Sequence, residues 1–190
     1  VLDDIPRLRD VTNICSIIED MGAEVKREKN HIEIDPAKVY KTEADHDLAR
    51  KLRASYYILG VMLGKTGHAR TTLPGGCNIG NRPIDLHLKG FRALGAEVNL
   101  DHGVVDVRAE KLKGAEIYLD YPSVGATINI MIAASRAEGK TVIENAAREP
   151  EIVDLANFLT VMGANIKGVG TDIIKIEGVD EMHGVEHRII

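Results

Sequence analysis

The chain has 190 residues, of which 44% are hydrophobic and 28% charged, and its net charge is −5. This length can bury a substantial core, and no apolar run approaches the ~18 residues of a membrane helix. The acidic balance and an aromatic content of only 4% argue against a protein that binds nucleic-acid phosphates or stacks on bases. Two cysteines, far apart in the sequence, argue against a secreted disulfide scaffold and predict a reducing, cytoplasmic environment.

One short signature recurs three times along the chain. The copies are Met21-Gly22-Ala23-Glu24-Val25, Leu94-Gly95-Ala96-Glu97-Val98 and Met162-Gly163-Ala164-Asn165-Ile166. Each copy ends an apolar stripe with the spacing of one helix face, so a helix is predicted before each glycine. Each glycine is a natural left-handed C-terminal cap. Cys15 lies on the first stripe and is expected to pack in the core.

Paired strands and further helices surround these signatures. Hairpins are predicted after each helix, at 24–26 with 31–34, 96–100 with 104–107, and 165–167 with 173–176. Two further helices are expected at 52–64 and 126–136, followed by strands at 68–73 and 140–144. These two helices are apolar on most faces, which predicts that they are buried.

The repeat reads β-α-β-α-β-β and is roughly 70 residues long. It predicts an α/β (α+β) lobe with pseudo-threefold symmetry, with helices inside and sheets outside. The repeats are expected at about 1–40, 41–112 and 113–180, and 181–190 looks like the start of a connection. The first copy lacks its leading strand and helix, so we expect the natural chain to begin further upstream.

The stretch from Leu73 to Leu86 contains three glycines within six residues, in a loop that the third repeat lacks. Because a sibling repeat builds the same helix without this loop, a functional role is favoured over a structural one. Cys77 in the loop is a candidate nucleophile or acid, since the flanking glycines expose its thiol and Arg82 favours the thiolate. The alternative is a small, inert core residue.

The following helix is predicted to open at Arg82-Pro83, with proline at its favoured first position. Free amide groups at a helix start bind anions, and Arg82 adds bidentate geometry for phosphate. Asp85 either caps this helix or accepts a hydrogen bond from a ligand amide. His87 replaces an apolar residue of the stripe, which is more typical of a satisfied core or rim histidine than of a catalyst.

Two other helix starts carry candidate anion ligands. Ser123 is either an ordinary N-cap or a phosphate ligand, and Arg53 is either a solvated charge or an anion contact. The spacing of the seven histidines does not predict a metal site, and there is no dinucleotide-binding glycine fingerprint.

These stretches together resemble the UDP-N-acetylglucosamine enolpyruvyl transferase family. The resemblance runs along essentially the whole chain, and its most specific segments are 51–55, 73–87, 120–127 and 144–154. It implies a transferase of two lobes, each an inside-out α/β barrel of three repeats. The implied reaction transfers enolpyruvyl from phosphoenolpyruvate to the 3′-hydroxyl of UDP-N-acetylglucosamine, for peptidoglycan synthesis, without a metal or other cofactor.

The resemblance also implies individual roles. Cys77 is the acid, can add covalently to phosphoenolpyruvate and is alkylated by fosfomycin, while Arg53 contacts the substrate anion. The UDP-sugar is held by two groups of residues, which are Arg82, Pro83, Ile84, Asp85 and Leu86 in the first group and Ser123 and Val124 in the second. This chain departs from some family members at Tyr121, where they carry a lysine, and at Tyr57, where they carry a tryptophan.

Further parts of the family's site belong to a second lobe, so the 190 residues alone are not expected to turn over. Nucleic acid and membrane are not expected partners. The alternatives are a 5-enolpyruvylshikimate-3-phosphate synthase-like transferase, against which Cys77 counts, and a non-catalytic lobe that binds a sugar nucleotide. A purely structural repeat domain leaves the glycine-rich loop unexplained.

Overall fold

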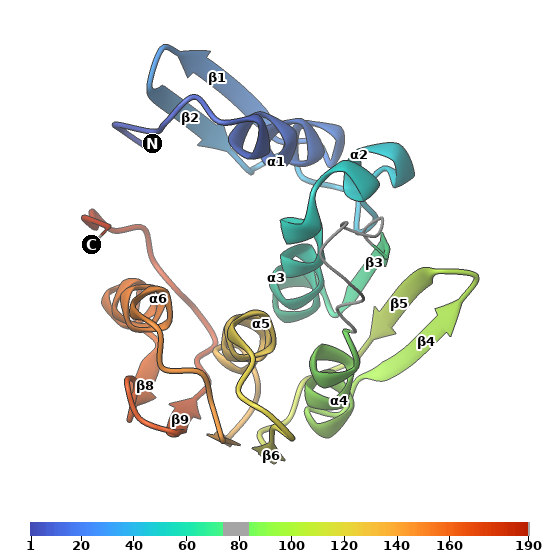
Figure 1. Ribbon diagram of the computed structural model, residues 1–190, viewed down its shortest axis with the longest axis vertical. Coiled ribbons are helices and arrows are strands. Elements are labelled where there is room, and N and C mark those ends of the chain that lie inside the picture. Colours follow the sequence, from blue (N-terminus) through green and yellow to red (C-terminus); the bar gives the residue numbers. More distant parts are fainter. Residues whose placement is uncertain (74–83, 190) are drawn as a thin grey trace.

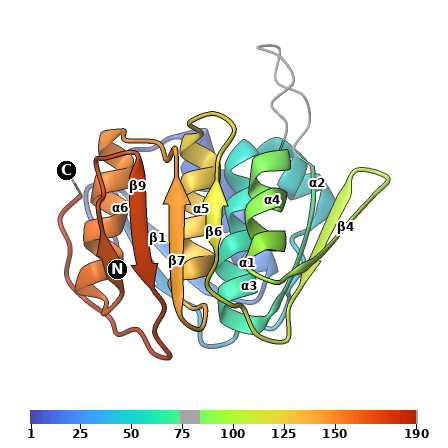
Figure 2. The ribbon, with the colours of Figure 1, turned by 90° about the horizontal axis from the view of Figure 1, so that it is seen from below.

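The computed structural model describes residues 1–73 and 84–189, which form three small sheets arranged around a group of helices (Figures 1 and 2). The first sheet pairs β1 (Glu24–Glu28) with β2 (His31–Asp35). The second has the order β3-β5-β4, and the third β6-β7-β9-β8. Their strands are β3 (His68–Thr72), β4 (Glu97–Asp101), β5 (Val104–Arg108), β6 (Glu116–Tyr118), β7 (Lys140–Glu144), β8 (Asn165–Lys167) and β9 (Ile173–Glu177).

The sheets lie toward the outside and the helices toward the inside, as the repeat predicts. Figure 1 shows α3 and α5 near the centre of the molecule, with the three sheets around them. The helices are α1 (Arg9–Asp20), α2 (His46–Lys51), the 3₁₀ turn η1 (Arg53–Tyr56), α3 (Tyr57–Thr66), α4 (Asp85–Ala93), α5 (Val124–Ala134) and α6 (Pro150–Val161).

The predicted helix ends are confirmed. Gly22, Gly95 and Gly163 follow α1, α4 and α6 with φ of 111°, 89° and 113°. Residues other than glycine rarely adopt such a positive φ, which is why a glycine follows each helix. The predicted hairpins β1–β2, β4–β5 and β8–β9 follow directly and are antiparallel.

The three sheets are related by more than their hairpins. In the third sheet β6 runs parallel to β7, and in the second the isolated pair Glu43 and Arg70 makes the corresponding parallel bridge beside β3. In the first, Leu2 pairs with Ile32 through backbone bonds of 2.7 and 2.9 Å, as β3 pairs with β5. The division at 40, 112 and 180 stays a prediction.

The helix expected at 52–64 is wrong in detail. Leu52 is extended, with φ −130° and ψ 117°, so a 3₁₀ turn precedes α3 and a separate helix, α2, precedes that turn. The Asp45 side chain caps α2 by accepting from the Leu48 amide at 3.0 Å. Because α2 has only six residues, it is too short to produce a recognisable apolar period.

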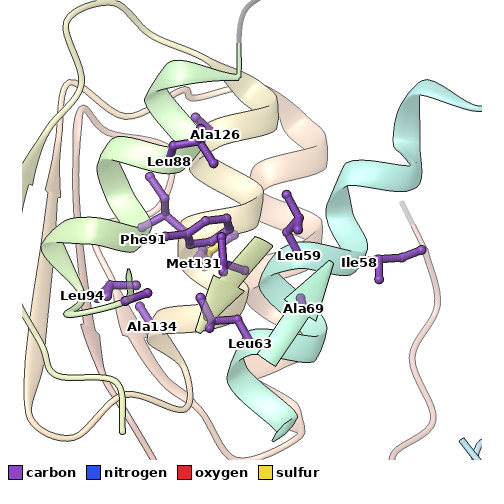
Figure 3. Packing of buried hydrophobic residues seen from close by; sticks show 14 of the residues in the cluster. Ile58, Leu59, Leu63, Ala69, Leu88, Phe91, Leu94, Ala126, Met131 and Ala134 are labelled. Atoms are coloured by element: carbon purple, nitrogen blue, oxygen red, sulfur yellow. The ribbon is translucent and has the colours of Figure 1, made fainter. Parts of the chain in front are cut away.

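The core lies among α3, α4 and α5. Phe91, Leu94, Leu63 and Met131 are no more than 1% exposed, and Figure 3 shows them, with Leu59, facing one another from the three helices. The predicted burial of α3 and α5 is therefore confirmed. No helix in the described part of the chain is long and apolar enough to cross a membrane.

Candidate functional site

Ser123 is the N-cap of α5, as one of its two sequence interpretations requires. Its backbone is extended, and its hydroxyl accepts a hydrogen bond from the Ala126 amide at 3.3 Å. Ser123 and Val124 are half-buried. An N-cap hydroxyl satisfies only one of the free amides of a helix start, so the first turn of α5 keeps further donors for an anion.

The start of α4 is described from Ile84 onward. The helix begins at Asp85 with Ile84 as its N-cap, and the Ile84 side chain makes no capping bond. The predicted opening at Arg82-Pro83, like Cys77, lies outside the described residues. Ile84 and Leu86 are 8% and 2% exposed, so their side chains belong to the core and only their backbone is suited to a polar ligand.

Asp85 does not act as a cap within the described part of the chain. It occupies the first turn of α4 with an exposed side chain, and no hydrogen bond caps the helix there. A carboxylate at this position still stabilises the helix start through the helix dipole. The ligand-binding alternative for Asp85 remains a prediction.

Three helix starts meet at Gly125. A Cβ placed on Gly125 would lie 3.0 Å from the Tyr56 Oη atom and 3.3 Å from the His87 Nε2 atom. The rings of Tyr56 and His87 pack edge to face with centroids 4.8 Å apart. The first turn of α5 is thus in contact with η1 and with α4. Arg53 is half-buried at the first position of η1, three residues before Tyr56.

Asn129 connects these elements, and sequence reasoning missed it. Its Oδ1 atom accepts from the Gly60 amide at 2.8 Å, and its Nδ2 atom donates to the Tyr56 carbonyl at 2.9 Å. Nδ2 also lies 3.0 Å from His87 Nδ1. The residue is fully buried. An asparagine inside an otherwise apolar helix was the available signal, since a buried amide needs several partners.

His87 is buried and neutral. Its side chain is 5% exposed, and burial lowers the pKa of the imidazole to about 4, while the negative charge of Asp85 acts in the opposite direction. A neutral imidazole has one donor and one acceptor nitrogen. His87 therefore supplies a fixed polar atom beside the α5 start without adding a charge.

We expect NMR titration of the His87 imidazole to give a midpoint near pH 4. In the unfolded chain the pKa of His87 is about 6.5. Between this value and the folded pKa of about 4, the unfolded chain binds more protons than the folded one. The free energy of unfolding therefore falls as the pH is lowered through that window. Between pH 7 and pH 4.5 the loss attributable to His87 is about 2 kcal/mol. A midpoint near 6.5, or a stability difference between wild type and His87→Gln that is the same at both pH values, would contradict this.

Cys15 is a packing residue, as predicted. It is 2% exposed, and burial raises the pKa of its thiol, which suppresses the reactive thiolate. Across residues 1–73 and 84–189, no three His, Cys, Asp or Glu side chains gather in a way that would hold a metal ion.

The sequence matches one protein family along its whole length. Residues 1–190 match the family described as EPSP synthase (3-phosphoshikimate 1-carboxyvinyltransferase). The chain belongs to this family. Several curated relatives carry the name UDP-N-acetylglucosamine 1-carboxyvinyltransferase. The protein from Halothermothrix orenii is 78% identical over 189 residues, and protein 1 of that name from Caldanaerobacter subterraneus is 57% identical over 192.

These relatives are longer than the chain. Each alignment covers 100% of the chain and 46% of the relative, so the chain spans about half the length of the curated relatives it matches. The alignments include the helix starts described above, because they cover the whole chain.

Solved structures share the fold. The enolpyruvyl transferase NikO from Streptomyces tendae superposes with a TM-score of 0.81 at 21% identity, covering 95% of this chain and 43% of that one. EPSP synthase from Acinetobacter baumannii gives 0.64 at 20% identity, covering 91% of this chain and 40% of that one. The predicted fold class, an enolpyruvyl transferase lobe, is therefore confirmed.

Proposed function

We propose that this chain is part of a transferase that moves the enolpyruvyl group of phosphoenolpyruvate to the 3′-hydroxyl of UDP-N-acetylglucosamine. The observation that carries the proposal is the 78% identity, over the whole chain, to a relative named UDP-N-acetylglucosamine 1-carboxyvinyltransferase. The solved structures, at 20–21% identity, support the fold alone.

The convergence of helix starts supports the binding half of this function. A sugar nucleotide carries a diphosphate, and the free amides of the α5 first turn suit its oxygens. In the proposed arrangement Ser123 and Val124 hold the diphosphate and Arg53 contacts a substrate anion. Gly125 lies in that turn, and its missing side chain lets Tyr56 and His87 pack closely against it.

The α4 start completes the proposed sugar-nucleotide site. Arg82 and Pro83, with the segment from Ile84 to Leu86, hold the UDP-sugar, and Asp85 accepts from an amide of the uracil. The exposed position of Asp85 and the buried side chains of Ile84 and Leu86 are compatible with this division between side-chain and backbone contacts.

Chemistry is proposed for Cys77, which acts as the acid toward phosphoenolpyruvate. A protonated thiol can donate to the carbanion-like centre that forms when the acceptor hydroxyl adds. The same thiol forms the phosphoenolpyruvate adduct and is alkylated by fosfomycin. The reaction belongs to peptidoglycan synthesis in the cytoplasm, and it thereby serves cell wall biogenesis, cell shape and cell division.

The acceptor that the protein uses tests the proposal. The matching family is described by another acceptor, 3-phosphoshikimate. The full-length protein should release phosphate from phosphoenolpyruvate in the presence of UDP-N-acetylglucosamine and not of shikimate 3-phosphate. Release with shikimate 3-phosphate alone would replace the proposed function. Binding of UDP-N-acetylglucosamine without turnover would instead indicate a non-catalytic sugar-nucleotide protein. Because 190 residues correspond to 46% of the relatives, we expect no turnover from this segment alone.

A further inference from the structure

The orientation of the Asn129 amide is fixed by the backbone of another helix. The Gly60 amide can only donate and the Tyr56 carbonyl can only accept, and they lie 2.8 and 2.9 Å from Oδ1 and Nδ2 respectively. Reversing the amide would place donor against donor and acceptor against acceptor. Tyr56 and Gly60 are four residues apart, which is the spacing of a backbone hydrogen bond in a continuous α-helix. Asn129 bridges this pair where η1 passes into α3.

The fixed amide determines the tautomer of His87. Nδ2 is a donor, so the His87 Nδ1 atom, 3.0 Å away, is the acceptor. A neutral imidazole that accepts at Nδ1 carries its proton on Nε2. Protonating Nδ1 would set two donors against each other in a buried site, which adds to the effect of burial in keeping the ring neutral.

The Nε2–H group is aimed at the first turn of α5. It lies beside Gly125, 3.3 Å from the position of a Cβ on that residue. The ring is 95% buried, yet Nε2 has no hydrogen-bond partner within residues 1–73 and 84–189. Nε2 is not one of the fully enclosed side-chain atoms that lack a partner in the described part of the chain, so an acceptor can reach it from outside, where α5 presents its own free amides. Both features indicate an acceptor atom supplied from outside the described chain.

We propose that Asn129 is a positioning residue that presents the Nε2–H of His87 to a phosphate oxygen of a sugar nucleotide held at the start of α5. The inference rests on the proposed function for the identity of the ligand. Asn129 itself does not touch the ligand. It holds a neutral donor in place beside Tyr56, with Asp85 as the charged neighbour of the ring, so donation does not depend on protonating His87.

Asn129→Asp retains the contact with the Gly60 amide, reverses the contact with His87 and replaces the donor to the Tyr56 carbonyl with an acceptor. The carboxylate still accepts from the Gly60 amide, but it now also accepts from His87, whose proton moves to Nδ1. Nε2 then donates only when the ring is charged. The KM for UDP-N-acetylglucosamine in the full-length variant should therefore rise about 10-fold as the pH increases through the new, raised pKa of His87, whereas no such dependence on His87 is expected in the wild type.

Thr127→Val is the matched control. Thr127 lies on the same helix, is equally buried and makes one buried bond, accepting from the Ala147 amide at 3.1 Å. This variant loses a hydrogen bond within the core without touching His87. It should leave the pH profile of KM unchanged, which separates positioning from a general weakening of α5.

The ¹⁵N spectrum of the histidine side chains in the full-length wild type keeps the proposal testable if Asn129→Asp does not fold. The free protein should show His87 as the Nε2–H tautomer, and saturating UDP-N-acetylglucosamine should shift the Nε2 resonance. An Nδ1–H tautomer, or an unshifted Nε2 resonance in a protein that turns over UDP-N-acetylglucosamine, would overturn this inference alone. Turnover of shikimate 3-phosphate in place of UDP-N-acetylglucosamine would instead overturn the proposed function.

Discussion

Gly60→Ala should lower the free energy of unfolding by roughly 4 kcal/mol, as the sum of overpacking and a broken buried hydrogen bond. A Cβ on Gly60 would lie 2.5 Å from the Asn129 carbonyl oxygen and would also collide with Asn129 Oδ1. The carbonyl belongs to the backbone of α5 and cannot swing aside as a side-chain end can. Relief therefore requires α3 and α5 to separate, which opens the core that they share.

Gly64→Ala, one turn later on the same face of α3, is the control. Its Cβ would meet the Arg136 side chain at 3.4 Å and the Ala133 Cα at 3.6 Å, which are ordinary contacts. In a helix interior this change is worth up to about 1 kcal/mol of added stability. Urea unfolding of both variants is the measurement. Equal effects from the two substitutions would show that the close approach at Gly60 is not what fixes the helix spacing.

The same contact links packing to the site. Gly60 donates to Asn129, and Asn129 holds His87. Separating α3 from α5 would therefore release His87 as well as loosening the core. The pair also explains why glycine stands inside a buried helix, where it otherwise costs about 1 kcal/mol relative to alanine.

Much of the fold follows from local sequence signals. Helix periodicity, the glycine after each helix and the hairpin turns predict three equivalent units because each signal acts over a few residues. The break at Leu52 could not be predicted in the same way. It separates two short helices with a single extended residue, and neither helix is long enough to show an apolar period.

The candidate site also contains some residues that local sequence signals predict and others that they do not. Ser123 was found because an N-cap is a local motif with a local bond. Asn129 was missed because its partners lie 69, 73 and 42 residues away in sequence, and no local pattern reports such contacts. The two interpretations of His87 are resolved toward a buried, hydrogen-bonded histidine. Its Nε2 atom, which bonds to no other residue in the described part of the chain, faces the start of α5.

Ser123→Ala and Ser123→Asp should rank in opposite orders for stability and for binding of UDP-N-acetylglucosamine. Ser123→Ala removes the N-cap bond and should cost about 1 kcal/mol, whereas Ser123→Asp restores an acceptor of equal quality and should leave stability close to wild type. If the diphosphate binds at the start of α5, the Ser123→Asp carboxylate lies beside its negative charge. Two like charges 4 Å apart repel by about 4 kcal/mol near a protein surface. Even after the side chain and ligand move apart in part, the KM for UDP-N-acetylglucosamine should rise at least about 100-fold. Ser123→Ala should raise that KM only a few-fold, by loss of one hydrogen bond.

The reversed order is decisive because a single structural defect cannot produce it. If Ser123 were only a cap, the less stable Ala variant would bind as well as or worse than the Asp variant, and KM would follow the unfolding free energy. If it borders the diphosphate, the more stable variant binds worse. Thermal unfolding and steady-state kinetics on the full-length protein measure the two orders independently. A KM for Ser123→Asp near that of the wild type would remove the diphosphate from the α5 start, and with it the ligand assigned to His87.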